Sequence, residues 1–394
     1  DFGLNLSSKE RVSRQNRFFL ETKKGENLPS VVDMTDDIES LYYQYIRDNI
    51  PYDERIWFLR SSFFPSDYFD AYVDEMNFYT NVFMKPYDNL EIMVGARYVD
   101  FTQKADEYVL VNRIVTIVPQ ELDIQDIYPS VSAKYTIDEQ NQVDLAVSRT
   151  YIAPDLREFT SGTYLSPFEV ADIKGNPNLV NTDILSFDLK YSYDFSDTEN
   201  IKAGAFYKYL DKPIEDVALL SSGIPLYSFE NSDNAVLYGI ELDGRKSLSF
   251  LHHTLNNYFI SGNFSYADSD VTLTPEQEEK FSTNHRQLQG LSQTVVNATL
   301  SYEKEDRTVA LSYNKMGERI RKVGYIDDIY AYPDQYEIPP HLLDFVWIEK
   351  LDDYTLKFKA GNLLDDEIIW TQGDRITKQF KTGTTFDFSA SYRF

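Results

Sequence analysis

Residues 385–394 read Thr-Phe-Asp-Phe-Ser-Ala-Ser-Tyr-Arg-Phe, and this stretch indicates the fold of the chain. Successive side chains of an extended strand point to opposite faces. One face therefore carries Phe386, Phe388, Ala390, Tyr392 and Phe394, and the other carries Thr385, Asp387, Ser389, Ser391 and Arg393. One apolar and one polar face predict a β-strand with water on one side only.

The same alternation recurs along the chain, for example over residues 186–195. In the stretch Val296, Ala298, Leu300 and Tyr302 the apolar face is small or aliphatic in the middle and aromatic at the end. A soluble β-sandwich would bury a mostly aliphatic face. An aliphatic band with aromatic ends is typical of strands that face lipid in an outer-membrane barrel.

Connections of two lengths alternate between these strands. Short turns are expected near residues 86–89, 138–141, 196–200, 303–306 and 351–353. Long polar segments lie between them, near 22–70, 104–126, 153–182, 212–234, 269–291, 320–340 and 371–380. Short turns on one rim and long loops on the other describe periplasmic turns and extracellular loops.

The alternation predicts about 14 antiparallel strands. They begin and end near 2–20, 73–85, 90–102, 128–137, 142–152, 184–195, 200–210, 236–250, 255–268, 293–303, 307–318, 341–350, 354–368 and 382–394. The fold class is therefore all-β, an antiparallel transmembrane barrel, and an even number of strands suits a barrel.

The composition fits this assignment. The chain is polar overall but contains 30 tyrosines and 26 phenylalanines, as a barrel with a wet interior requires. A formal net charge of −26 argues against nucleic acid as a partner, because binding phosphates needs clustered lysine and arginine. The absence of cysteine suits a protein that crosses the oxidising periplasm.

Several motifs from Tyr151 onward resemble the C-terminal half of TonB-dependent outer-membrane receptors. Residues 149–159 (RTYIAPDLREF) look like the family's FRAP box, and residues 175–179 (GNPNL) are similar to its NPNL box. Residues 238–245 (YGIELDGR) and 361–367 (GNLLDDE) look like two later strands of the family. The terminal Phe394 resembles the signal that the barrel-assembly machinery reads.

Family barrels have 22 strands around a plug domain. The resemblance implies that residues 1–394 are the C-terminal portion of a single barrel domain, holding about 14 of the 22 strands without the plug. Because no signal peptide opens the sequence, we expect the chain to be a fragment.

The resemblance further implies an active transporter in the bacterial outer membrane that takes up a scarce nutrient. A ferric siderophore is the expected substrate. The TonB complex is the expected partner, through a plug outside this chain, and lipopolysaccharide and outer-membrane lipid are further partners. No cofactor is implied.

Substrate capture is expected at the extracellular loops. Arginine binds carboxylate or phosphate with two hydrogen bonds and so suits anionic iron chelates. The candidate ligand-binding residues, which lie at or beyond strand ends expected to lead into long loops, are Arg149, Tyr151, Arg157, Tyr164, Arg319, Arg321 and Lys322.

Haem, metal and enzymatic functions are disfavoured. Haem receptors of the family carry a histidine between the two boxes, and residues 153–178 contain none. The sequence has no HExxH motif, phosphate-binding loop or nucleophile elbow, so we expect neither a metal site nor a catalytic residue.

Two alternatives stay open at this point. A complete 14-stranded passive channel or fatty-acid transporter would have no plug and would conduct ions or bind acyl chains. A soluble β-rich binding module, such as a surface lectin, would need no detergent, but the aromatic bands and alternating loop lengths weigh against it.

Overall fold

The computed structural model describes residues 1–14, 17–22, 57–62, 68–112, 114–166, 171–219, 226–327 and 330–393. The predicted assembly signal at Phe394 lies outside these residues, as does most of the expected long loop at 22–70. Among the described residues, no helix is long and apolar enough to cross a membrane.

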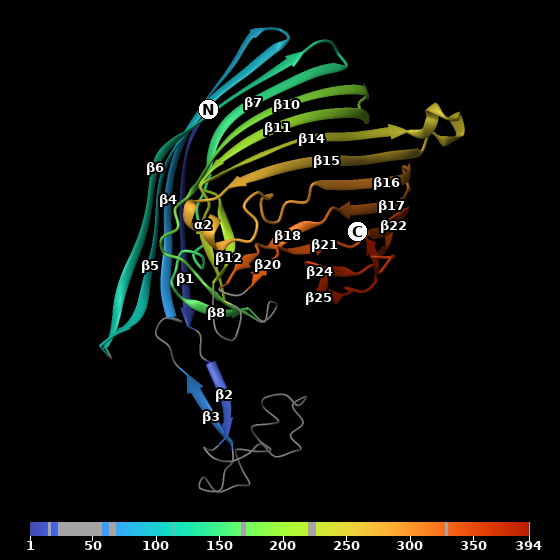
Figure 1. Cartoon of the computed structure of the whole chain (residues 1–394). Helices are drawn as coiled ribbons and strands as arrows, with labels where there is room; N and C mark the ends of the chain where they lie inside the picture. Colours follow the sequence, from blue (N-terminus) through green and yellow to red (C-terminus); the bar gives the residue numbers. More distant parts are fainter. Residues whose placement is uncertain are drawn as a thin grey trace.

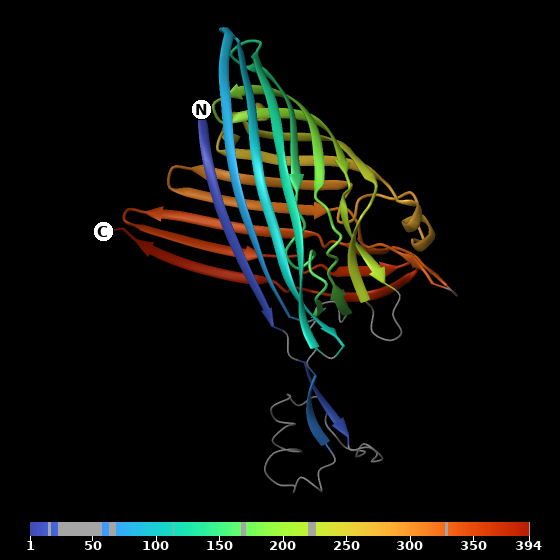
Figure 2. The same cartoon turned by 90° about the vertical axis from the view of Figure 1, so that its left-hand side faces the viewer.

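Fourteen strands form one continuous antiparallel sheet, in which each strand pairs with its neighbours in chain order (Figures 1 and 2). They are β1 (Phe2–Arg14), β4 (Tyr68–Tyr87), β5 (Leu90–Val111), β6 (Ile114–Thr136), β7 (Asn141–Ile152), β10 (Thr182–Ser196), β11 (Glu199–Asp211), β14 (Asn234–Ser247), β15 (Tyr258–Thr272), β16 (Thr294–Lys304), β17 (Arg307–Met316), β22 (Leu342–Leu351), β23 (Tyr354–Gly361) and β26 (Thr385–Tyr392). The sheet is strongly curved, with β1 and β26 at its two edges (Figure 2). The predicted all-β class and strand number are confirmed.

The long connections carry ordered structure of their own. One four-stranded sheet contains β8 (Thr163–Ser166), β9 (Ala171–Lys174), β12 (Ile214–Leu219) and β13 (Leu226–Asn231). Another contains β18 (Arg319–Lys322), β21 (Gln335–Ile338), β24 (Ile368–Gln372) and β25 (Arg375–Phe380). Smaller elements are the pair β2 (Arg17–Thr22) and β3 (Trp57–Ser62), the pair β19 (Tyr325–Ile326) and β20 (Ala331–Tyr332), and helix α2 (Pro275–Lys280).

The register places apolar side chains in rows on the lipid face. Leu189 of β10 lies opposite Leu145 of β7 and Ala205 of β11, and Ala205 lies opposite Ile240 of β14. Residues directly opposite one another in adjacent strands share a face, so these four side chains form one row across the sheet. Leu189 is 51% exposed, which suits a side chain that meets acyl chains.

The opposite face is polar. Lys190 lies opposite Asp144 and Gly204, and Gly204 lies opposite Glu241. Lys190 and Glu241 therefore face away from the apolar side of the sheet.

Aromatic side chains collect near the short turns. Tyr258 and Tyr302 are cross-strand neighbours with ring centroids 5.0 Å apart, and Tyr354 and Tyr392 repeat the arrangement at 4.8 Å. This row is the girdle expected at the membrane–water interface.

One expected loop is wrong. Residues 104–126 belong to the long hairpin of β5 and β6, which pair from Leu90–Tyr135 to Val111–Ile114. Their polar composition suggested a loop, but Glu107 is buried where Ser161, from the segment after β7, covers the strands. Glu107 accepts hydrogen bonds from the amide and the hydroxyl of Ser161, which compensates for its burial.

We predict that Leu189→Arg disrupts assembly, because a cation facing lipid at mid-membrane costs about 2–4 kcal/mol. Ser265→Arg is the matched control, since Ser265 lies opposite Glu241 on the polar face. Heat-modifiable electrophoretic mobility of the protein recovered from outer membranes measures the folded fraction. Normal folding of Leu189→Arg would contradict the assigned register.

Candidate functional site

The long connections pack against each other and against the ends of the barrel strands. Leu156, Phe159 and Leu179, from the segment between β7 and β10, share a buried core with Phe69 of β4 and Phe229 of β13. The elements α2, β12, β18 and β21 lie together at the end of the sheet opposite the turn between β14 and β15 (Figure 1). The site is therefore built on folded loops.

The Gly175–Leu179 segment fastens the loop that follows β7. The Asn176 amide donates to the carbonyl of Glu158 at 2.6 Å, and its side-chain amide donates to the carbonyl of Phe229 at 2.8 Å. A Cβ on Gly175 would lie 2.0 Å from the carbonyl oxygen of Thr160, so only glycine fits. The box that resembles NPNL thus has a structural role here.

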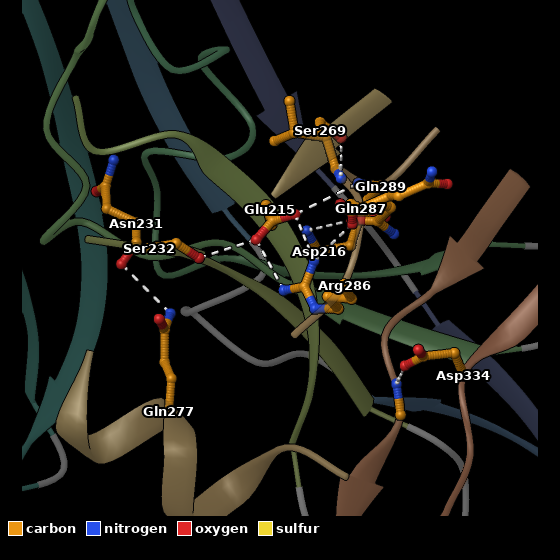
Figure 3. A network of polar contacts seen from close by, with 12 residues as sticks. Glu215, Asp216, Asn231, Ser232, Ser269, Gln277, Arg286, Gln287, Gln289 and Asp334 are labelled. Atoms are coloured by element: carbon orange, nitrogen blue, oxygen red, sulfur yellow. Dashed lines mark hydrogen bonds and ion pairs between the residues drawn. The ribbon is translucent and has the colours of Figure 1, made fainter. Parts of the chain in front are cut away.

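A buried ion pair joins the loop after β11 to the loop after β15 (Figure 3). Both guanidinium Nη atoms of Arg286 donate to the carboxylate of Glu215 at 2.8 Å, and the two side chains are 1% and 3% exposed. The Ser232 hydroxyl donates to the same carboxylate at 2.8 Å. A bidentate pair with an added hydrogen bond compensates for desolvation and fixes the two loops together.

Beside this pair lies a cleft of about 390 Å³ between the loops. Its lining combines carboxylates, two arginines, amide groups and a few apolar side chains: Glu158, Ile214, Glu215, Asp216, Phe229, Leu288, Gln289, Gly290, Arg319, Ile320, Arg321 and Glu337. Of the seven residues predicted to bind ligand, Arg319 and Arg321 line this cleft together.

Protein side chains orient both arginines. An Nη of Arg319 lies 2.5 Å from one carboxylate oxygen of Glu337, and the other oxygen accepts from the Trp370 indole at 3.1 Å. Arg321 donates to Gln335 and stacks 3.5 Å from the centre of the Trp370 ring. A guanidinium has five N–H donors, so the contacts of Arg319 with Met316 and Glu337 leave it donors that can meet a ligand.

Lys322 lies behind the cleft. Its Nζ lies 2.5 Å from a carboxylate oxygen of Asp216 and 4.7 Å from the centre of the Tyr227 ring, and the residue is buried. The Asp216 amide donates to Gln289, whose side chain donates to the carbonyl of Arg321. Lys322 therefore holds the loop after β17 against β12.

Arg157 and Tyr164 lie close to the cleft without lining it. The Arg157 guanidinium lies 4.9 Å from the centre of the Tyr164 ring. Burial raises the pKa of the neighbouring Glu158 carboxyl, and the charges of Asp155 and Asp216 raise it further. Glu158 therefore takes up a proton more readily than an ordinary glutamate.

Arg149 and Tyr151 belong to a different cluster. They lie at the end of β7, where β7 continues beyond its pairing with β6. A guanidinium nitrogen of Arg149 lies 2.7 Å from a carboxylate oxygen of Asp126 and 3.2 Å from one of Asp183. The ring of Tyr151 stacks on that of Tyr128, with the ring centres 4.9 Å apart. The seven predicted residues therefore do not form a single site.

Arg97 was missed by the sequence analysis. Its guanidinium lies 5.9 Å and 5.8 Å from the ring centres of Tyr128 and Tyr151. Within the described ranges it has no carboxylate partner, so it is a cation that aromatic faces hold in place. Its place inside β5, away from any loop, gave no signal of such a role.

The cleft carboxylates were missed as well. Glu158, Glu215, Asp216 and Glu337 are four of 64 acidic residues, so only the fold distinguishes them. Among the described residues no cluster of three or more histidine, aspartate or glutamate side chains could hold a metal ion. His252 and His253 lie in the turn between β14 and β15, and His341 contacts Tyr313 near the start of β22.

Comparison with known proteins assigns the fold. Residues 35–394 match the family described as TonB dependent receptor-like, beta-barrel. The siderophore receptor PiuA from Acinetobacter baumannii aligns with 99% of this chain and 51% of its own, at 13% identity and a TM-score of 0.61. The ferric-catecholate import receptor Fiu from E. coli K12 aligns with 83% of this chain and 46% of its own, at 12% identity and a TM-score of 0.60.

The ferric yersiniabactin uptake receptor FyuA from Yersinia pestis gives a TM-score of 0.53 at 12% identity, over 82% of this chain and 44% of its own. At such identities the likeness establishes the fold alone. The chain spans about half the length of these structures. No curated protein matches the sequence.

We predict that Glu215→Ala loosens the loops, because breaking a buried ion pair by removing one partner costs about 3–5 kcal/mol. Faster hydrogen exchange over residues 212–219 and 275–292 would report the change. The double variant Glu215→Leu, Arg286→Met should recover much of the protection, since it leaves no unpaired buried charge. Equal exchange in wild type and Glu215→Ala would show that the pair does not hold the loops.

Proposed function

Because this chain belongs to the TonB-dependent receptor-like β-barrel family, whose members are non-enzymatic proteins of the bacterial outer membrane, we propose that it forms part of an active transporter for a ferric siderophore. Residues 1–394 form the C-terminal portion of its barrel domain. The energy for transport comes from the TonB complex, which acts through a plug domain that the described residues do not contain. Transport then consists of binding and gating, with no covalent step.

The observation that carries the proposal is the cleft that contains Arg319 and Arg321. It lies among the folded loops, where a substrate arriving from outside first meets the protein. The oriented guanidinium of Arg319 can donate hydrogen bonds to an anionic oxygen ligand of iron, and the positive charge of Arg321 adds to the attraction. The neighbouring carboxylates orient the arginines. They also repel any ligand whose negative charge lies next to them and not next to the arginines.

The names of the aligned receptors support the same substrate class. PiuA is named a siderophore receptor, Fiu a ferric-catecholate import receptor and FyuA a ferric yersiniabactin uptake receptor. The chemistry of the cleft and the names of these structures of the same fold both support the proposed nutrient class.

We predict that the double variant Arg319→Ala, Arg321→Ala weakens siderophore binding by about tenfold or more, because hydrogen bonds to charged groups contribute about 1.5–3 kcal/mol each. A panel of ferric catecholates and ferric hydroxamates, titrated against the protein purified from outer membranes, provides the measurement. Growth under iron limitation reports uptake.

Arg307→Ala serves as the control, because Arg307 pairs with Glu349 in the register next to the short turn between β16 and β17. Unchanged binding of every panel member by the double variant would contradict the role of the two arginines. Ion conductance through the purified protein without any siderophore binding would instead favour the passive channel.

We also predict a pH dependence. The Glu158 carboxylate repels an anionic ligand, and its pKa is raised, so affinity should increase as the pH falls and Glu158 takes up a proton, at a higher pH than an ordinary glutamate would. The affinity of Glu158→Gln should depend on pH less steeply, because its amide does not titrate. Equal pH profiles of the two proteins, measured with one siderophore, would exclude Glu158 as the responsible group.

A further inference from the structure

A second cavity lies on the lipid face of the barrel, far from the loop cleft. It is a groove of about 610 Å³ along β10, β11, β14, β15 and β16, near the turn between β14 and β15. The side chains that line it on the lipid face include Phe195, Ile201, Leu242, Ile260 and Phe264. The register places Leu242 directly opposite Phe264, and Phe264 opposite Val296, in one lipid-facing row.

Small residues give the groove its depth. Gly244 lies opposite Gly262, and Gly262 lies opposite Ala298, so three adjacent strands present almost no side chain along this row. The larger side chains beside the row form the walls. A recess with an apolar lining, within the band that meets lipid, fits an acyl chain.

The turn between β14 and β15 closes one end of the groove. Residues 248–257 make it longer than the other short turns of the described chain, and it contains two 3-10 segments, Leu248–Phe250 and His253–Leu255. The Ser247 hydroxyl accepts from the Ser249 amide and donates to the carbonyl of Asn256, which fixes the base of the turn. Figure 1 shows this turn, in yellow, projecting beyond the sheet. Phe250 lines the groove and is 64% exposed.

Opposite charges lie at the same end of the groove. The Lys246 ammonium lies 2.6 Å from a carboxylate oxygen of Glu199 and 3.8 Å from the centre of the Phe195 ring. Both charged side chains keep some exposure, 35% for Lys246 and 18% for Glu199. A zwitterionic headgroup complements this pair, because its phosphate can meet Lys246 while its ammonium meets Glu199.

We propose that this groove binds one zwitterionic phospholipid of the periplasmic leaflet. One acyl chain lies along the row Gly244, Gly262 and Ala298, and the headgroup meets the Lys246–Glu199 pair. The exposed side chain of Phe250, from the turn between β14 and β15, covers the acyl chain. The short turns mark the periplasmic rim, which assigns the leaflet.

The test uses the protein purified in mild detergent and phosphatidylethanolamine as the probe, with bound lipid counted by native mass spectrometry. Wild type should retain one phosphatidylethanolamine per protein in preference to phosphatidylglycerol. Ala298→Phe fills the groove and should lower the affinity for that lipid by about tenfold. Ala205→Phe makes the same change on the lipid face outside the groove and should retain the lipid.

Lys246→Gln removes the ammonium that is proposed to meet the headgroup phosphate and leaves the small residues at the floor of the groove unchanged. It should remove the preference for phosphatidylethanolamine over phosphatidylglycerol while leaving heat-modifiable folding unchanged. Equal lipid retention by Ala298→Phe and Ala205→Phe would overturn the site. An unchanged headgroup preference in Lys246→Gln would overturn the assigned zwitterion contact.

Discussion

The structure depends on one constraint, which is that lipid offers no hydrogen-bond partner to a backbone amide or carbonyl. Twelve of the fourteen antiparallel strands meet it by pairing with a neighbour on each side, whereas β1 and β26 each pair on one side only within the part of the chain that the structure describes. Pairing fixes the register, and the register fixes which side chains meet lipid. Leu189 therefore faces acyl chains while the adjacent Lys190 faces the interior, and the lipid groove and the girdles follow from the same alternation.

Outside the membrane this constraint no longer applies, because water can form hydrogen bonds with the backbone amides and carbonyls. The long connections instead form small sheets and pack around their own apolar clusters. Their polar contacts join segments that are distant in sequence: Glu215 and Arg286 are 71 residues apart, and Lys322 and Asp216 are 106 apart. The loop cleft lies between these segments, so its shape depends on several loops at once.

The difference between the membrane-spanning strands and the loops outside the membrane explains what the sequence could predict. Strands such as β10 and β26 were found from a period of two residues, a local signal that the membrane enforces over their whole length. The full length of the β5–β6 hairpin was not found, since burial of Glu107 against Ser161 of another loop cannot be read from the neighbouring sequence. Arg319 and Arg321 were identified because they follow an outward strand. Arg149 and Tyr151 satisfied a similar rule but lie in another cluster, and Glu215 among 64 acidic residues gave no signal.

The buried pair of Glu215 and Arg286 has a consequence for how such a protein can diverge. A change at either position alone leaves a charge without a counterion, whereas a simultaneous change of both to apolar residues does not. Neither of these two positions can therefore change independently of the other, although each loop is free to vary at its exposed tip. Adaptation to a different nutrient should proceed by paired replacements at the base of the loops and by single replacements at their surface.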